Sequence, residues 1–192
     1  MVPDRNDKSI VYFPFKLDNP VYKEITFITA MKIACDNPTC RCSDVYFSAK
    51  EANDNGKIIE PVKSHSFIID IVKKKLKQDN YYNIPDWDLP FGRLFLSEMT
   101  DEIYKKLRRA FYTYKQDIAE NANVNECKFD FSQIEYTVEN EGYMLDYQEL
   151  FPFCKTFKVD YDNYLYITAD QYCLCSTCHC KHTGINIIEI AK

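Results

Sequence analysis

Short apolar runs rich in β-branched and aromatic residues dominate the start of the chain. They occupy residues 10–16, 25–33, 45–47, 57–59 and 66–72. This composition between turn signals is typical of strands, so we expect the first 72 residues to be mainly β-structure. Pro14 favours an edge position for the first strand, because proline cannot donate a ladder hydrogen bond. The sequence Asn53-Asp54-Asn55-Gly56 predicts a hairpin turn.

The apolar period changes to that of an amphipathic helix after residue 99. Thr100 offers a hydroxyl cap, and Asp101 and Glu102 place acidic groups in the first turn. Apolar side chains then recur at helical spacing, at Ile103, Leu107, Ala110, Phe111, Tyr114 and Ile118. We predict a helix that ends near residues 121–123. Before it, the lysine-rich residues 73–77 could end a strand or open a short helix, and residues 81–91 predict a loop.

Strand signals return in the last third of the chain. They occupy residues 129–131, 134–138, 156–161, 164–168 and 185–190. Asp162-Asn163 predicts a turn between two of them. The sequence therefore predicts an α+β fold with two related antiparallel β units, residues 1–72 and 124–192. A helical insertion, residues 73–123, separates the units within one compact domain.

Composition and charge narrow the class of protein. Of 192 residues, 46% are hydrophobic and 15% aromatic, enough for a core that does not depend on metal alone. The net charge of −5 gives no overall attraction to nucleic acid or to an anionic membrane. The first residues lack the apolar core of a signal peptide, and no stretch approaches the roughly 20 apolar residues of a membrane span. We therefore expect a cytoplasmic protein with reduced thiols, which agrees with the odd count of nine cysteines.

Two cysteine clusters carry the candidate chemistry. The second places four of the nine cysteines and two of the three histidines within ten residues: Cys173, Cys175, Cys178, His179, Cys180 and His182. The first cluster, Cys35, Cys40 and Cys42, repeats the spacing Cys-x4-Cys-x-Cys of Cys173, Cys178 and Cys180, 138 residues earlier. Apolar runs flank both clusters, so we predict that the two β units arose by internal duplication, each with a cysteine knuckle.

Soft thiolate ligands at this density favour zinc, with Cu(I) or an iron–sulfur cluster as alternatives. Each repeat supplies three thiolates, and the fourth ligand stays open. Cys175 or His182 could complete the second site. Asp44, His65, Cys127 or Cys154 could complete the first, although His65 is more typical of an ordinary strand histidine and the last two of core thiols. The two triads could also bind two zinc ions together through bridging sulfurs.

A resemblance supports the zinc prediction. The stretch from Asp170 through Cys178-His179-Cys180, and the stretch Cys35 to Val45 even more, resemble cysteine-rich segments of bacterial proteins of unknown function that often carry SEC-C-type zinc motifs. The resemblance covers about a dozen residues per copy and implies zinc binding by Cys35, Cys40, Cys42, Cys173, Cys178 and Cys180. Neither copy has the SEC-C spacing itself, in which Cys-x-Cys precedes a longer gap and an adjacent pair of ligands.

The sequence favours a binding or scaffold protein over an enzyme. No zinc-protease motif, nucleophile elbow or glycine-rich phosphate loop is present, and a thiolate-rich sphere makes zinc a poor Lewis acid. The predicted partner is another protein. One alternative is nucleic-acid binding, through a basic patch at Lys105, Lys106, Arg108 and Arg109. Another is a redox switch, in which oxidation pairs the cysteines of the second cluster and releases the metal.

Overall fold

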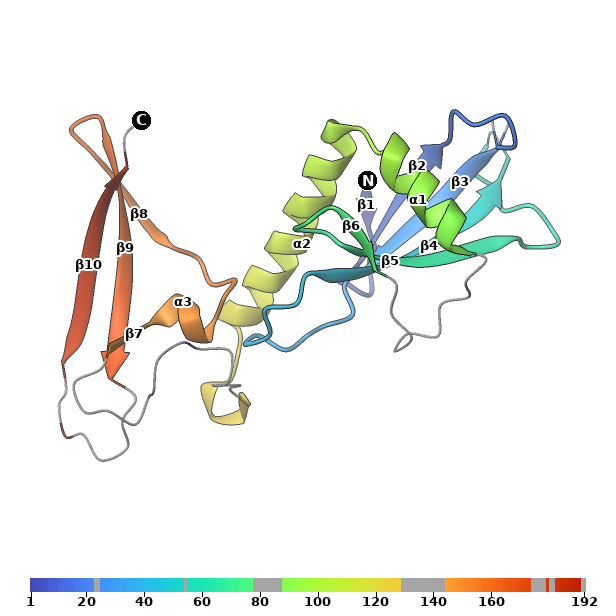
Figure 1. Ribbon diagram of the computed structural model, residues 1–192. Coiled ribbons are helices and arrows are strands. Elements are labelled where there is room, and N and C mark those ends of the chain that lie inside the picture. The colour runs from blue at the N-terminus through green and yellow to red at the C-terminus, as the bar shows by residue number, and fades with distance from the viewer. Residues whose placement is uncertain are drawn as a thin grey trace. The chain divides into compact units, whose positions relative to one another are not determined.

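The computed structural model describes residues 1–22, 25–53, 55–77, 88–128, 144–173, 179 and 182–190. These residues form an α+β protein of antiparallel sheets and a few helices (Figure 1). The chain divides into two compact units, Met1–Asp36 with Cys42–Tyr114 and Asn37–Arg41 with Lys115–Lys192. In the described part of the chain, no helix is long and apolar enough to cross a membrane.

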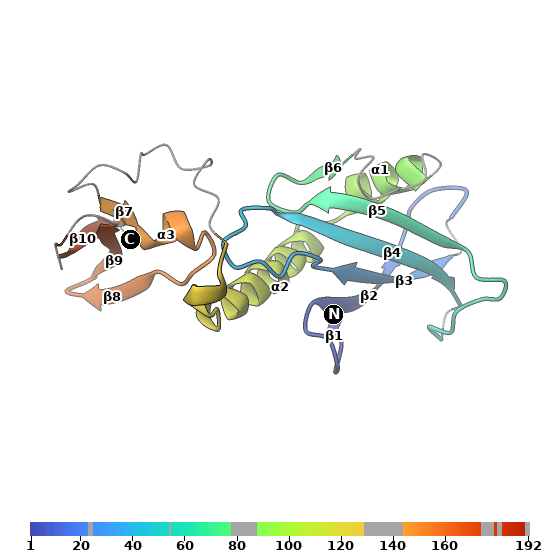
Figure 2. The same cartoon turned by 90° about the horizontal axis from the view of Figure 1, so that it is seen from below.

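The first unit contains an antiparallel sheet whose six strands follow one another in chain order (Figure 2). The strands are β1 (Val2–Pro3), β2 (Ile10–Lys16), β3 (Thr26–Lys32), β4 (Asp44–Ala52), β5 (Ser64–Asp70) and β6 (Lys75–Lys77). The strands predicted at residues 10–16, 25–33, 45–47 and 66–72 are confirmed. Pro14 lies beyond the two residues of β2 that pair with β1, at the edge of the described sheet, where its missing N–H leaves no ladder bond unmade.

The turn predicted after β4 is confirmed, but the strand expected directly after it is not. The Gly56 N–H donates to the Asn53 carbonyl at 2.8 Å, and Gly56 has φ = 75°, a conformation that glycine adopts without strain. Only a single bridge, between Ala52 and Ile58, follows the turn. The returning strand, β5, begins at Ser64.

Two helices accompany the first sheet, α1 (Leu89–Glu98) and α2 (Asp101–Glu120). The α2 helix confirms the predicted amphipathic helix, and the Thr100 hydroxyl accepts a hydrogen bond from the Ile103 N–H at 3.3 Å as a cap. The α1 helix was not predicted, and the expected loop over residues 81–91 is wrong from residue 89 onward. A proline within its first two positions suits a helix start, because the first N–H groups have no intrahelical partner.

The core of the first unit consists mainly of phenylalanine rings between the sheet and α1. Phe47 and Phe67, from neighbouring strands, are stacked with their ring centroids 5.4 Å apart, and Phe95 of α1 lies 4.9 Å from Phe67. All three side chains are fully buried. A Cβ atom on Gly92 would lie 2.8 Å from Leu76 Cδ1, so α1 approaches the sheet as closely as glycine permits.

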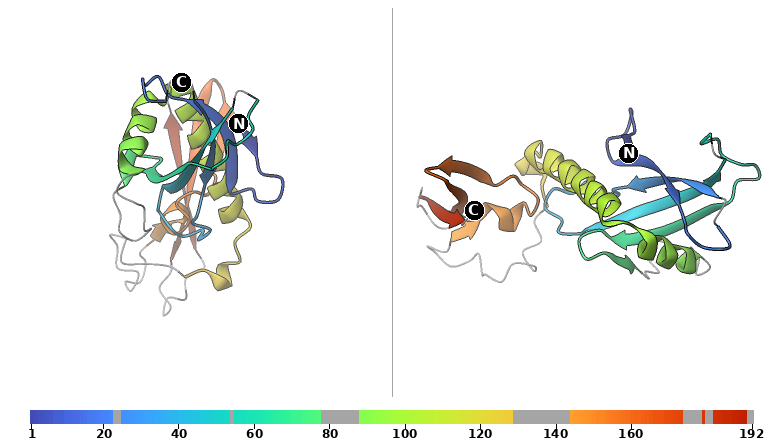
Figure 3. Two further views of the ribbon diagram at one scale, coloured as in Figure 1. Left: turned by 90° about the vertical axis from the view of Figure 1, so that its right-hand side faces the viewer. Right: turned by 90° about the horizontal axis from the view of Figure 1, so that it is seen from above.

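The second unit contains a four-stranded antiparallel sheet centred on β9 (Figure 3). Its elements are a 3₁₀ turn (Val124–Glu126), β7 (Met144–Asp146), α3 (Tyr147–Leu150), β8 (Phe157–Tyr161), β9 (Tyr164–Cys173) and β10 (Thr183–Ile190). Along β9, β10 pairs on one side, and β7 and β8 pair on the other. Positive φ values of 48° at Asp162 and 66° at Asn163 confirm the predicted turn between β8 and β9.

The strands predicted at residues 156–161, 164–168 and 185–190 are confirmed as β8, β9 and β10. The strands predicted at residues 129–131 and 134–138 lie outside the described residues. Ala119, Leu150 and Phe151 form a small hydrophobic core in this unit. The three-part division at residues 72 and 123, and the internal duplication, remain predictions.

Candidate metal site

Cys35, Cys40 and Cys42 form a compact group of thiols, which we call the cysteine triad. Their sulfur atoms all lie within 4.8 Å of one another, and each residue is half-buried. Two sulfurs bound to one tetrahedral zinc, each about 2.3 Å from the metal, are about 3.8 Å apart. Because the triad lies within eight consecutive residues, the local chain sets these distances. The three cysteines are therefore close enough to bind one metal ion together.

The turn at Asn37-Pro38 brings Cys40 back toward Cys35. The Cys40 N–H donates to the Asn37 carbonyl at 3.3 Å. The Asn37 side-chain oxygen accepts from the Thr39 N–H at 3.0 Å and from the Thr39 hydroxyl at 2.8 Å. Asparagine stabilises such turns because its side chain hydrogen-bonds the backbone two residues on. The predicted turn is confirmed, and it shapes the ligand loop.

A buried lysine holds the same turn from α2. Lys115 is 1% exposed, and its ammonium donates to the Asn37 carbonyl at 3.1 Å. The ammonium also lies 5.2 Å from the centroid of the Phe153 ring, within the range of a cation–π interaction. A buried ammonium is stable only where such groups replace its water. The Lys115 ammonium therefore fixes the cysteine loop at Asn37.

Two further contacts fix the loop to the rest of the second unit. The Thr39 hydroxyl donates to the Lys128 carbonyl at 2.9 Å. The Arg41 guanidinium donates to the Glu149 carbonyl at 3.1 Å and pairs with the carboxylate of the same residue. Residues 37, 39 and 41 are thus each held by a separate partner, so the loop is shaped by packing as well as by its own sequence.

The ends of the cysteine loop are anchored in the first unit. Before the loop, the Ile33 N–H donates to the Ser9 carbonyl at 2.9 Å. After it, the Ser43 hydroxyl donates to the Asp70 carboxylate at 2.6 Å. Burial opposes ionisation of Asp70, but hydrogen bonds from Ser43 and from the Lys73 and Val72 N–H groups outweigh it, so the pKa of Asp70 is lowered.

No fourth ligand joins the triad within the described part of the chain, where no further His, Cys, Asp or Glu lies at the same mutual distance. Two of the four predicted candidates have other partners. The Asp44 carboxylate lies 3.3 Å from the Lys77 ammonium. His65 lies 2.8 Å from the Asp88 carboxylate and stacks on Phe91 at 3.9 Å, as expected of an ordinary strand histidine.

Asp88 lies within residues 81–91, for which the sequence predicted a loop, but its side chain is buried and only 2% exposed. Its carboxylate also accepts a hydrogen bond from the Ser66 N–H at 2.9 Å. These contacts could not be predicted from the sequence, because they join residues more than twenty positions apart.

Cys127 and Cys154, the other two candidates, pack half-buried against the small core of the second unit. Burial raises the pKa of the Cys154 thiol, and the nearby carboxylates of Asp170 and Glu120 raise it further. A thiol with a raised pKa is a weaker nucleophile and a poorer metal ligand near neutral pH. These residues suit a packing role.

Cys175, Cys178 and Cys180 of the second cluster lie outside the described residues. Cys173 is the last residue of β9, and His182 immediately precedes β10. Tyr172 pairs with Thr183, so Cys173 and His182 are the next two positions in the same register. Residues opposite each other in this way have neighbouring side chains on one face. Metal binding by the second cluster remains a prediction.

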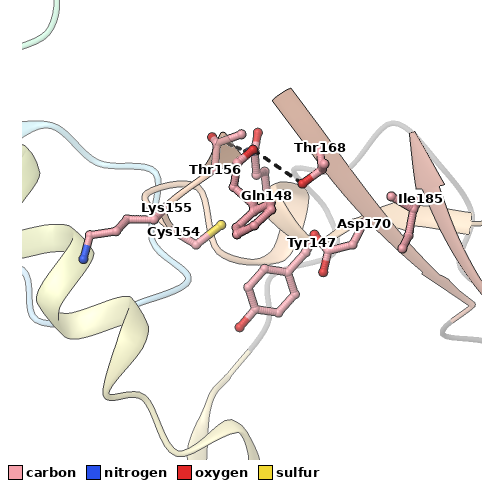
Figure 4. Close-up of a pocket in the computed structure, with 9 residues that line it drawn as sticks. Tyr147, Gln148, Cys154, Lys155, Thr156, Thr168, Asp170 and Ile185 are labelled. Atoms are coloured by element: carbon pink, nitrogen blue, oxygen red, sulfur yellow. Dashed lines mark hydrogen bonds between the residues drawn. The ribbon is translucent and has the colours of Figure 1, made fainter. Parts of the chain in front are cut away.

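A groove of about 440 Å³ lies between α3 and the second sheet (Figure 4). The Gln148 amide donates to the Thr156 hydroxyl at 2.9 Å within it, and the Asp170 carboxylate accepts from the Tyr172 hydroxyl at 2.7 Å beside it. Its lining includes one thiol, Cys154, and one carboxylate, Asp170. These donors are fewer than the three of the triad, so the triad is the stronger candidate for a metal.

Comparison of the chain with protein-family models, with curated proteins and with solved structures found no match. The resemblance to SEC-C-associated segments therefore remains a prediction.

Proposed function

We propose that this protein is a zinc-binding interaction module in which the metal has a structural role. The observation that carries the proposal is the cysteine triad, three thiols within 4.8 Å of one another on a loop held in place. Three thiolates donate much negative charge to a metal and suit zinc better than hard cations such as magnesium. The fourth ligand would come from a residue outside the described part of the chain or from water.

The setting of the triad favours structural over catalytic zinc. A catalytic site needs a general acid or base close to an open coordination position. The loop instead meets Lys115, whose ammonium is engaged with the Asn37 carbonyl, and Arg41, which pairs with Glu149. A metal held by the triad would fasten a loop that is already hydrogen-bonded at three positions.

A second zinc site, formed by Cys173, Cys175, Cys178, Cys180 and His182, is part of the proposal. The register of β9 and β10 supports it. Tyr172 and Thr183 are the last paired positions, and Cys173 and His182 each lie one residue beyond them. The density of thiols between them supplies the remaining ligands. Such a site would cross-link the connection between these two strands.

The proposed partner is another protein, met in the reducing cytoplasm. Two members of the predicted basic patch have partners that weaken the case for nucleic acid. The Lys106 ammonium is bonded to the Glu102 carboxylate at 2.5 Å, and the Arg108 guanidinium lies 5.7 Å from the centroid of the Tyr104 ring. The exposed apolar residues of the second sheet, in contrast, favour contact with protein.

Elemental analysis of the protein purified without chelator tests the proposal. We expect one or two equivalents of zinc in the wild-type chain, and about one equivalent less after Cys40→Ser with Cys42→Ser. Cys127→Ser is the matched control, a half-buried thiol that is not in the triad, and it should retain all the zinc. Full zinc content in the double variant would contradict a metal at the triad. A wild-type chain without metal would favour the redox-switch alternative.

A further inference from the structure

One face of the second sheet collects exposed apolar side chains from three strands. Phe157 of β8 and Ile187 of β10 both pair with Thr168 of β9, so all three side chains lie on the same face. Alternation along the strands adds further residues to that face. We call the following set the apolar face: Phe157, Val159, Tyr161, Tyr164, Ile185 and Ile187.

We propose that the apolar face is the docking surface for a second copy of this chain. Four of its side chains, Phe157, Tyr161, Ile185 and Ile187, are 69%, 71%, 65% and 68% exposed. The face therefore exposes several hundred Å² of apolar surface, as much as the largest patch on a typical monomer. A standard interface takes about 800 Å² from each partner, and this face provides a large share of that area.

α3 lies beside one part of this face and leaves most of its apolar side chains exposed. Tyr147 of α3 contacts Tyr172 near one end of β9, at a ring-centroid distance of 6.1 Å. Over β8 and the facing parts of β9 and β10, the apolar side chains stay exposed in the part of the second unit that the structure describes. Exposing phenylalanine, tyrosine and isoleucine side chains to water is unfavourable in free energy. Burying them against a partner is therefore favourable.

The charge distribution favours a second copy over a strongly charged partner. The two carboxylates on this face, Asp170 and Glu189, lie on either side of its centre and receive the hydroxyls of Tyr172 and Tyr166, at 2.7 Å and 3.4 Å. Lys158 and Asp160 alternate to the opposite face of the sheet. The centre of the face is therefore neutral, and two copies related by a twofold axis would bring apolar surface onto apolar surface.

Packing of the second sheets of two copies face to face would form a β-sandwich across the dimer axis. The proposal specifies the partner of the interaction module and in that sense rests on the proposed function. It does not require metal at the triad, because no residue of the triad belongs to the apolar face.

Sedimentation equilibrium at micromolar concentrations tests the proposal. The wild-type chain should reach twice its 22.7 kDa mass. Ile187→Glu places a charge in the desolvated interface and should weaken dimerisation by about 100-fold or more. Asn186→Glu is the matched control, because it adds the same charge at an exposed position on the opposite face of β10 and should leave the dimer intact. Phe157→Glu, on a different strand, should repeat the effect of Ile187→Glu.

A wild-type monomer throughout this range would overturn the proposal, and so would a dimer that Ile187→Glu and Phe157→Glu leave unchanged. Zinc content and circular dichroism of the same samples separate the two proposals. A dimer without zinc would contradict the metal-binding function and support this inference. A zinc-bound monomer would do the reverse. An equal loss of dimer in Asn186→Glu would show that the apolar face is not the interface.

Discussion

The two sheets of this protein are built from similar residues but bury them differently. In the first sheet, Phe27, Phe47 and Phe67 are completely buried and pack against rings of α1. In the second, no residue of β8, β9 or β10 is fully buried, and Phe157 and Ile187 are mostly exposed. An apolar strand pattern predicts that a face will be covered, but it does not say what covers it.

The difference indicates two sources of stability. The first unit has a core of packed aromatic rings, whose burial stabilises it. The described core of the second unit is small, and the loop with the cysteine triad is fixed to it through Lys115, Thr39 and Arg41. We therefore propose that the second unit depends more than the first on contacts outside its own core.

Replacing one phenylalanine in each sheet tests whether the two sheets gain different stability from these side chains. Phe47→Ala should lower the free energy of unfolding by about 3–5 kcal/mol, because it leaves a cavity among fully buried rings. Phe157→Ala should change it by about 0.5 kcal/mol or less in the monomer, since its side chain is 69% exposed. Urea denaturation of dilute protein, followed by circular dichroism, measures both. Equal losses of unfolding free energy in the two variants would contradict the difference in burial between the two sheets.

Lys115→Met should lower both the stability of the second unit and the affinity of the cysteine triad for zinc. The substitution leaves the Asn37 carbonyl without its ammonium donor and should lower the free energy of unfolding by about 2 kcal/mol. Zinc affinity, measured by competition with a chelator, should fall by about 10- to 100-fold, as for other residues that support ligands. Lys155→Met is the control, because Lys155 is largely exposed and pairs with Glu120. Unchanged zinc affinity in Lys115→Met would show that the anchor does not shape the site.

Asp70→Asn should weaken the first unit in a pH-dependent way. The folded-state pKa of Asp70 is below its ordinary value, so its ionised form stabilises the fold above the unfolded-state pKa of about 3.9. That contribution is lost as pH falls through the folded-state pKa. We expect the variant to lose about 1–2 kcal/mol at neutral pH and the difference from wild type to shrink in acid. A difference that grows in acid would contradict this assignment.

The smallest expected effect concerns Cys154. Because the Asp170 carboxylate helps to raise the pKa of this thiol, Asp170→Asn should lower the pKa and increase the thiolate fraction. Alkylation of Cys154 at mildly alkaline pH, located by mass spectrometry, should accelerate a few-fold. The rate for Cys127 serves as an internal reference in the same experiment. Slower alkylation of Cys154 would show that Asp170 acts on it otherwise than by its charge.

The regular elements could be predicted from sequence where their period is long and clean. The α2 helix has a cap, acids in its first turn and apolar residues at helical spacing, so its bounds followed closely. The α1 helix was missed because Pro90 and Gly92 are typical of loops. In the structure, the proline stands at the helix start and the glycine allows close contact with the sheet. β7 and α3, with three and four residues, are too short for a periodic signal.

The candidate site could be predicted only in its local part. The spacing of Cys35, Cys40 and Cys42, with the turn at Asn37-Pro38, was sufficient to indicate a shared ligand position. The role of Lys115 could not be read from the chain, because it contacts a residue 78 positions away and lies on a helix with many exposed lysines and arginines. Long-range contacts of this kind leave no periodic or local signal.

X-ray absorption at the zinc edge tests for a metal at the cysteine triad, because it detects the ligands themselves. The sample should be the Cys178→Ser, Cys180→Ser variant, which removes two thiols of the second cluster and leaves the triad untouched. We expect bound zinc with a ligand shell dominated by sulfur at about 2.3 Å. Zinc bound only by nitrogen and oxygen, or no zinc in this variant when the wild-type chain contains it, would contradict a metal site at Cys35, Cys40 and Cys42.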